Sequence, residues 1–265
     1  MVILAGLALP FIVVTVLWFV STGLVAMINH RLRTSYGRAL VIASLCGLCG
    51  LGLLVLTVHS TANLAIYVSF IGGLLIWSWH EISFLTGAVA GSHRSPCPAE
   101  ARGWERFSLA TMALLHHEIA LVMTAGLLLS LASVTSNPTG AYTFTLLLIF
   151  RLSSKLNIYW GVPNMSDELL PSHLAYLKTY FGPRQLHPML ILSTLTILGL
   201  AAWFLLGAFG ASAPHESTMA GLLCCLCLLA ALEHLFLAIP FRDSALWSWA
   251  MAAKERPNLG EGVQP

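Results

Sequence analysis

The chain has 265 residues, of which 57% are hydrophobic and only 9% are charged. Soluble domains carry about 25% charged residues, so this composition excludes an ordinary water-soluble fold. The formal net charge of +2 gives no indication of a nucleic-acid partner.

Apolar stretches of about 20 residues recur along the whole chain, and an α-helix needs this length to cross a bilayer. We therefore predict an all-α, polytopic membrane protein with a bundle of about seven transmembrane helices. Residues 1–254 are expected to form one transmembrane domain and residues 255–265 a short flexible tail. The predicted spans are roughly 3–27, 39–59, 63–89, 108–133, 141–162, 188–210 and 218–240.

The orientation follows from the lysine and arginine residues outside the spans. All of them come after the first, third, fifth or seventh span, and the alternate loops contain none. Because basic loops stay on the cytoplasmic side, the N-terminus is predicted to be periplasmic and the C-terminus cytoplasmic.

Two cytoplasmic stretches have the pattern of amphipathic helices that lie at the membrane surface. The first is near 171–181, and its apolar stripe comprises Leu174, Leu177 and Phe181. The second is near 243–254, where Trp247 and Trp249 suit the headgroup region.

Four of the spans carry ionisable side chains, which are costly in hydrocarbon. At a rise of 1.5 Å per residue they fall roughly 10–18 Å from one boundary of a core about 30 Å thick. We expect one polar layer inside the bundle, slightly to the cytoplasmic side of the midplane, in which opposite charges pair. Its expected members are Glu81, His117, Glu118, Arg151, Lys155, Asn157, Glu233 and His234.

This polar layer allows three interpretations. It can be a structural network of ion pairs and hydrogen bonds, or a histidine in it can be the axial ligand of a magnesium tetrapyrrole or haem. It can also be a di-metal or iron centre, since inward Glu and His from several helices build such sites. The metal ligands would then be Glu81, His117, Glu118, Glu233 and His234, with His80 as a weaker candidate.

Two features argue against the metal interpretation. The spacing Glu-x-x-His and any histidine-rich box are absent from the sequence. Neighbouring residues of a helix also point about 100° apart, so an adjacent His-Glu pair cannot aim both groups at one ion without strain.

Four polar residues near the end of the fifth span and in the following loop complete the set of candidates. Asn157 and Asn164 flank the end of that span, where they can cap it or bind backbone groups. Glu168 can cap the surface helix or pair with Lys178, and His173 lies within that helix.

Several stretches resemble the PuhE family of photosynthetic complex assembly proteins from purple and related phototrophic bacteria. They are "WSWHEISFLTG" (77–87), "LHHEIAL" (115–121), "RLSSKLNIYWGVPN" (151–164), "LPSHLAYLKTYF" (170–181) and "LEHLFLAIPFRDSALWSWAM" (232–251). The resemblance covers nearly the whole chain and includes Glu81, His117, Glu118, Lys155, Asn157, Asn164, His173, Glu233 and His234. His80 departs from the pattern that we expect for the family, which makes it a poorer ligand candidate than His117 or His234.

The resemblance implies a role in assembly of the photosynthetic reaction centre and its core light-harvesting complex. It also implies a location in the bacterial inner membrane or the intracytoplasmic photosynthetic membrane. The partners would be the lipid bilayer, subunits of these complexes and other assembly factors, and the protein would bind or hand over bacteriochlorophyll or a precursor. We expect this role to need no catalysis. The alternative is a membrane-bound, metal-dependent oxidoreductase that acts on a tetrapyrrole or isoprenoid intermediate.

Overall fold

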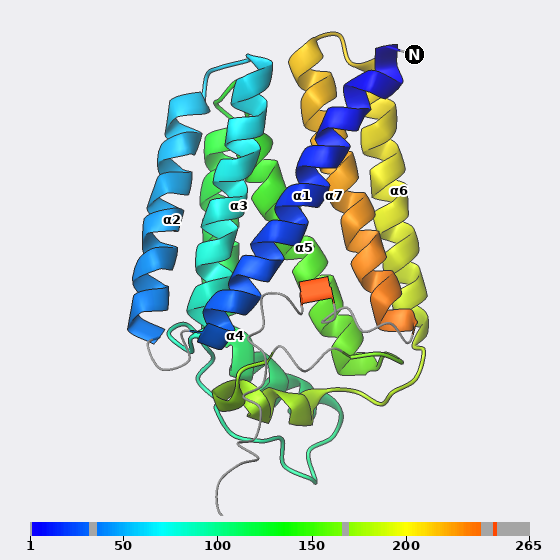
Figure 1. Ribbon diagram of the computed structural model, residues 1–265. Coiled ribbons are helices and arrows are strands. Elements are labelled where there is room, and N and C mark those ends of the chain that lie inside the picture. The colour runs from blue at the N-terminus through cyan, green and yellow to red at the C-terminus, as the bar shows by residue number, and fades with distance from the viewer. Residues whose placement is uncertain (1, 32–35, 166–169, 240–245, 248–265) are drawn as a thin grey trace, which may run out of the picture.

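The computed structural model describes residues 2–31, 36–165, 170–239 and 246–247 (Figure 1). In these ranges the structure has seven long α-helices, which run up and down in turn. Their bounds are α1 (Val2–Arg31), α2 (Tyr36–Thr57), α3 (Asn63–Leu85), α4 (Gly103–Ala132), α5 (Thr139–Trp160), α6 (Pro188–Gly210) and α7 (Pro214–Ala238). A short 3₁₀-helix, η2 (Ser172–Tyr180), lies between α5 and α6.

Six of these helices are long and apolar enough to cross a membrane, and this confirms the prediction of a polytopic helical bundle. The remaining long helix, α5, has 22 residues and carries Arg151 and Lys155. It contacts α3, α4 and α7, so the most polar of the long helices is placed among apolar ones.

The helices are not equally buried. α3 and α7 occupy the centre, with 56% and 67% of their apolar windows buried, whereas α2 and α6 are each 17% buried. α2 packs on α3, and α6 packs on α7. The two outer helices therefore present apolar side chains such as Leu48 and Leu206 outward, as a membrane helix facing lipid does.

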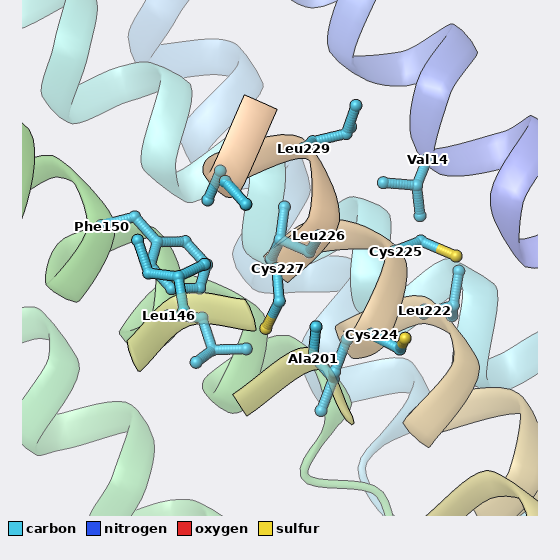
Figure 2. Packing of buried hydrophobic residues seen from close by; sticks show 14 of the residues in the cluster. Val14, Leu146, Phe150, Ala201, Leu222, Cys224, Cys225, Leu226, Cys227 and Leu229 are labelled. Carbon is cyan, nitrogen blue, oxygen red and sulfur yellow. The ribbon is translucent and has the colours of Figure 1, made fainter. Parts of the chain in front are cut away.

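The core around α7 contains three of the cysteines (Figure 2). Cys224, Cys225 and Cys227 are buried against α1, α5 and α6, where they fill space as small hydrophobic side chains. Val14, Phe150 and Ala201 belong to the same cluster.

The basic end of the bundle is the end where α1, α3, α5 and α7 finish, and it holds the basic loops. The third span ends at Leu85 instead of residue 89, because Gly87 has a positive φ of 76° that turns the chain away. The following loop then runs along α4, where the Gly91 N–H donates to the Ala113 carbonyl at 3.0 Å.

The segment η2 lies at this basic end and is helical, as predicted near 171–181, but it is a 3₁₀-helix. Three residues per turn place positions i, i+3 and i+6 on one face. The buried stripe is therefore Leu174, Leu177 and Tyr180, whereas the prediction of Phe181 assumed an α-helix. The stripe packs against Phe84 and Ala113.

The second predicted surface helix, near 243–254, lies outside the described residues except for Leu246 and Trp247. Trp247 was expected in the headgroup region, but it is buried against α1. Its indole N–H donates to the Phe19 carbonyl at 3.0 Å, and its ring meets the ring of Trp18 edge to face at 5.3 Å. The predicted tail, 255–265, also lies outside the described residues.

Candidate functional site

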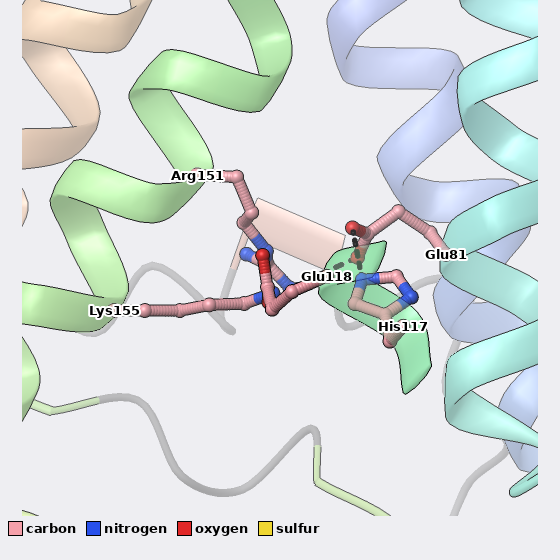
Figure 3. Close-up of polar contacts among 5 residues, drawn as sticks. All are labelled: Glu81, His117, Glu118, Arg151 and Lys155. Carbon is pink, nitrogen blue, oxygen red and sulfur yellow. Dashed lines mark hydrogen bonds and ion pairs between the residues drawn. The ribbon is translucent and has the colours of Figure 1, made fainter. Parts of the chain in front are cut away.

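Two ion pairs extend from α5 to the neighbouring helices (Figure 3). Arg151 donates to a carboxylate oxygen of Glu81 on α3 at 3.0 Å, and Lys155 donates to Glu118 on α4. The two cations are four residues apart and so share one face of α5. The structure therefore joins three helices through charges that the sequence placed at one depth.

Glu81, Lys155 and Glu233 lie closer to the ends of their helices than expected, whereas Glu118 is 15 residues from the start of α4, about 22 Å. Glu81 is four residues before the end of α3, Lys155 five before the end of α5, and Glu233 five before the end of α7. At 1.5 Å per residue these positions are about 6–8 Å from the ends of their helices, and Arg151 is about 14 Å from the end of α5. The sequence estimate was deeper because the predicted spans ran past the observed helix ends.

His117 is fully buried beside the first ion pair. Its Nε2 lies 3.8 Å from Oε1 of Glu81, which is too long for a hydrogen bond. Among the described residues, no hydrogen-bond partner is found for either ring nitrogen of His117. The Oε1 atom of Glu81 also has none there. The ring is held by packing, with the Phe84 ring centroid at 4.7 Å.

The other two buried histidines have separate partners. The Nδ1 of His234 meets the Ala230 carbonyl at 2.9 Å and must donate to it. Its Nε2 then accepts from the Ser153 hydroxyl at 2.9 Å. His80 contacts the Thr124 hydroxyl at 3.0 Å on α4.

Glu233 contacts α1. Its carboxylate accepts a hydrogen bond of 2.7 Å from the indole N–H of Trp18. No group of three or more His, Cys, Asp or Glu side chains able to hold a metal ion is found in the described part of the chain. Of the five predicted metal ligands, Glu81 and His117 are the pair that approach each other most directly.

The two asparagines stabilise helix contacts. Asn157 donates to the Ser193 hydroxyl of α6 at 2.9 Å. Asn164 follows the end of α5, as expected, and binds backbone groups of α7. Its side chain and backbone N–H donate to the carbonyls of Phe236 and Leu237 at 2.8 and 3.0 Å. These are carbonyls of the last turn, which have no partner within a helix.

Of the remaining two loop candidates, His173 contacts the hydroxyl of Tyr36 at 3.2 Å, and this contact ties η2 to the start of α2. Glu168 lies outside the described residues.

A cavity with two lobes borders this network. One lobe of about 300 Å³ lies between α1, α3, α5 and α7, and the other, of about 370 Å³, extends to η2 and Trp247. The lobes share six lining residues, which are Trp18, Thr22, Leu85, Arg151, Ser154 and Glu233. Most of the remaining lining is apolar, and this combination is typical of sites for small molecules.

The sequence analysis missed this cavity. Arg151 and Glu233 were identified as polar residues of the membrane interior, but Trp18 and Thr22 on α1 were not. The available signal was the spacing of Trp18 and Thr22, which at i, i+4 lie on one face of the helix.

The chain belongs to a family described as "Protein of unknown function (DUF3623)", whose profile matches residues 4–258. It is 35% identical over 251 residues to an "Uncharacterized 30.4 kDa protein in puhA 5'region" from Rhodobacter capsulatus. The alignment covers 91% of this chain and 89% of that relative. No solved structure matches the chain.

Proposed function

We propose that this protein is an integral membrane factor for assembly of the photosynthetic reaction centre and core light-harvesting complex, and that it binds bacteriochlorophyll or a precursor in its cavity. The relative from a phototrophic bacterium is encoded in the puhA region, which supports a photosynthesis-related role. The resemblance to the PuhE family points to the same process, although the name PuhE stays a prediction. The partners would be subunits of these complexes and other assembly factors.

The observation that carries this proposal is the two-lobed cavity inside a membrane bundle. Its position between α1, α3, α5 and α7 makes it suited to a molecule that is dissolved in the bilayer. The polar groups at the junction of its lobes are few, and they would orient such a molecule, while the apolar lining would bury most of its surface.

The ion pairs would keep this cavity open in the absence of its ligand. Arg151 and Lys155 link α5 to α3 and α4 through side-chain ion pairs. A protein built in this way binds and releases a pigment without a chemical step, as an assembly factor requires.

The test is made in Rhodobacter capsulatus lacking the gene of the relative. We expect lower amounts of reaction centre and core antenna per milligram of membrane protein, no accumulation of a single pigment precursor, and recovery when this chain is expressed. Unchanged amounts of both complexes in the deletion strain would contradict the proposal.

One observation favours the alternative, a metal-dependent oxidoreductase acting on a tetrapyrrole or isoprenoid intermediate. The buried Nε2 of His117 and Oε1 of Glu81 face each other at 3.8 Å, and neither atom has a hydrogen-bond partner in the described residues. This alternative predicts about one or two equivalents of a transition metal in the purified protein. It also predicts the build-up of one defined precursor in cells that carry Glu118→Ala.

A further inference from the structure

We infer that the cavity selects a neutral ligand and not an acid. The ligand would be a ring that bears carbonyl oxygens and has apolar groups on both sides. This inference rests on the proposed function, because it names the chemical class of the molecule that the cavity would hold. Quinones with isoprenoid tails and esterified tetrapyrroles share this chemistry.

The shape of the cavity places the polar part of the ligand at its middle. Arg151, Ser154 and Glu233 line both lobes and so mark their junction. Beyond the junction one lobe is lined by side chains such as Phe70, and the other by side chains such as Leu177. A chain with a single terminal head group would leave its polar end in one of these apolar lobes, whereas a ring with groups on both sides would not.

The charges around the junction argue against an acidic ligand. Each of the two cations in the layer already faces a carboxylate, Arg151 facing Glu81 and Lys155 facing Glu118. Glu233, which also lines the wall, accepts a hydrogen bond from Trp18. Because both cations already face carboxylates, an oxyanion would add a negative charge that neither of them compensates, in a region of low dielectric constant.

The junction still offers hydrogen-bond donors to a neutral acceptor. A guanidinium has five N–H groups, and among the described residues that of Arg151 donates one hydrogen bond, to Glu81. Its side chain is 45% exposed although it lies between membrane helices, and it lines both lobes of the cavity. A carbonyl oxygen accepts from such a donor and adds no net charge.

The test is a binding titration with the purified full-length protein, followed by tryptophan fluorescence, since Trp18, Trp77 and Trp247 line the cavity. The probes are a ubiquinone with a short isoprenoid tail, esterified bacteriochlorophyll, and bacteriochlorophyllide, which has a free carboxylate. We expect saturable binding of at least one neutral probe and at least tenfold weaker binding of the free acid. The neutral probe that binds more tightly identifies the source of the ligand.

A matched pair of variants ties binding to the cavity. Ser154→Phe fills the junction and should weaken binding at least tenfold, whereas Leu152→Phe adds the same side chain at an exposed position of α5 and should leave it within twofold. If Ser154→Phe does not fold, Thr22→Phe with Val20→Phe as its control asks the same question from α1.

Equal or tighter binding of the free acid, binding to Ser154→Phe as to wild type, or no binding of any probe to the folded wild type would each overturn the inference. The assembly role is measured separately in cells. A protein that restores the complexes but binds none of these probes would therefore keep the proposed assembly role and lose both the proposed pigment binding and this inference.

Discussion

The two ends of the bundle are held together by different means. Away from the basic end, α3 meets α2 and α5 through glycines: a Cβ at Gly73 would lie 2.6 Å from the Gly140 carbonyl oxygen, and a Cβ at Gly50 would lie 2.7 Å from that of Gly72. Toward the basic end, α3 and α5 are joined by the long side chains of Glu81 and Arg151.

This difference explains why the cavity lies where it does. Small residues let backbones approach closely, and little room remains between the helices. Ion pairs of long side chains bridge a wider separation, and the space beside them becomes a cavity with polar groups on its wall. The glycine contacts thus pack one part of the bundle tightly, and the cavity lies toward the other end.

The largest effect is expected from breaking the second ion pair. Lys155→Met should destabilise the protein by about 3–5 kcal/mol, because it leaves the carboxylate of Glu118 between membrane helices without its cation. The double variant Lys155→Met with Glu118→Gln should recover most of this loss. Reversible unfolding of the purified protein measures both, and equal losses in the single and double variants would show that the charge is not the cause.

Disrupting the close contact between Gly73 of α3 and Gly140 of α5 should have a smaller but clear effect. Gly73→Ala should cost about 1–3 kcal/mol, since its methyl group would overlap the backbone of Gly140. Gly52→Ala is the control, because nothing lies within 4 Å of its added Cβ and alanine favours a helix. Thermal unfolding should separate the two variants, and equal stabilities would mean that the helices do not meet at Gly73.

The smallest effect concerns pH and the contact of η2 with α2. Partial burial, and to a lesser extent Arg94, lower the pKa of His173 below its ordinary value of 6.5, while an interaction with the backbone of Leu85 raises it. The unfolded chain therefore binds the proton more readily, so this contribution to stability is full above about pH 6.5 and is lost as the pH falls below it toward the lowered pKa.

The measurement is the unfolding temperature between pH 7.5 and 5 for wild type and His173→Gln. The variant should lose less stability than wild type over this range, and the difference should be small because the ring is largely exposed. A larger loss in the variant would contradict this assignment.

The sequence predicted the helices well because hydrocarbon imposes a simple rule on length and composition. The sixth span, 188–210, matches α6 at both ends. The sequence also placed Glu81, Glu118, Arg151 and Lys155 at one depth, because the rise per residue of a helix is fixed. What it could not predict was which groups pair, since rotation of each helix about its axis depends on packing.

The departures from prediction have the same origin. His234 and Glu233 are neighbours in the chain, but His234 contacts Ser153 and Glu233 contacts Trp18. Asn164 donates to a carbonyl of α7, because the loop after α5 runs past the end of that helix. Because η2 is a 3₁₀-helix, its buried stripe contains Tyr180 and not the predicted Phe181. The period of an apolar pattern this short does not distinguish the two helix types.

The central claim is that the protein acts through the cavity beside Arg151. The most direct test is to express Ser154→Phe or Leu152→Phe in the Rhodobacter capsulatus deletion strain and to compare reaction centre and core antenna at equal levels of the two variants in the membrane. The account predicts that Leu152→Phe restores both complexes and Ser154→Phe does not. Full restoration by Ser154→Phe would contradict it.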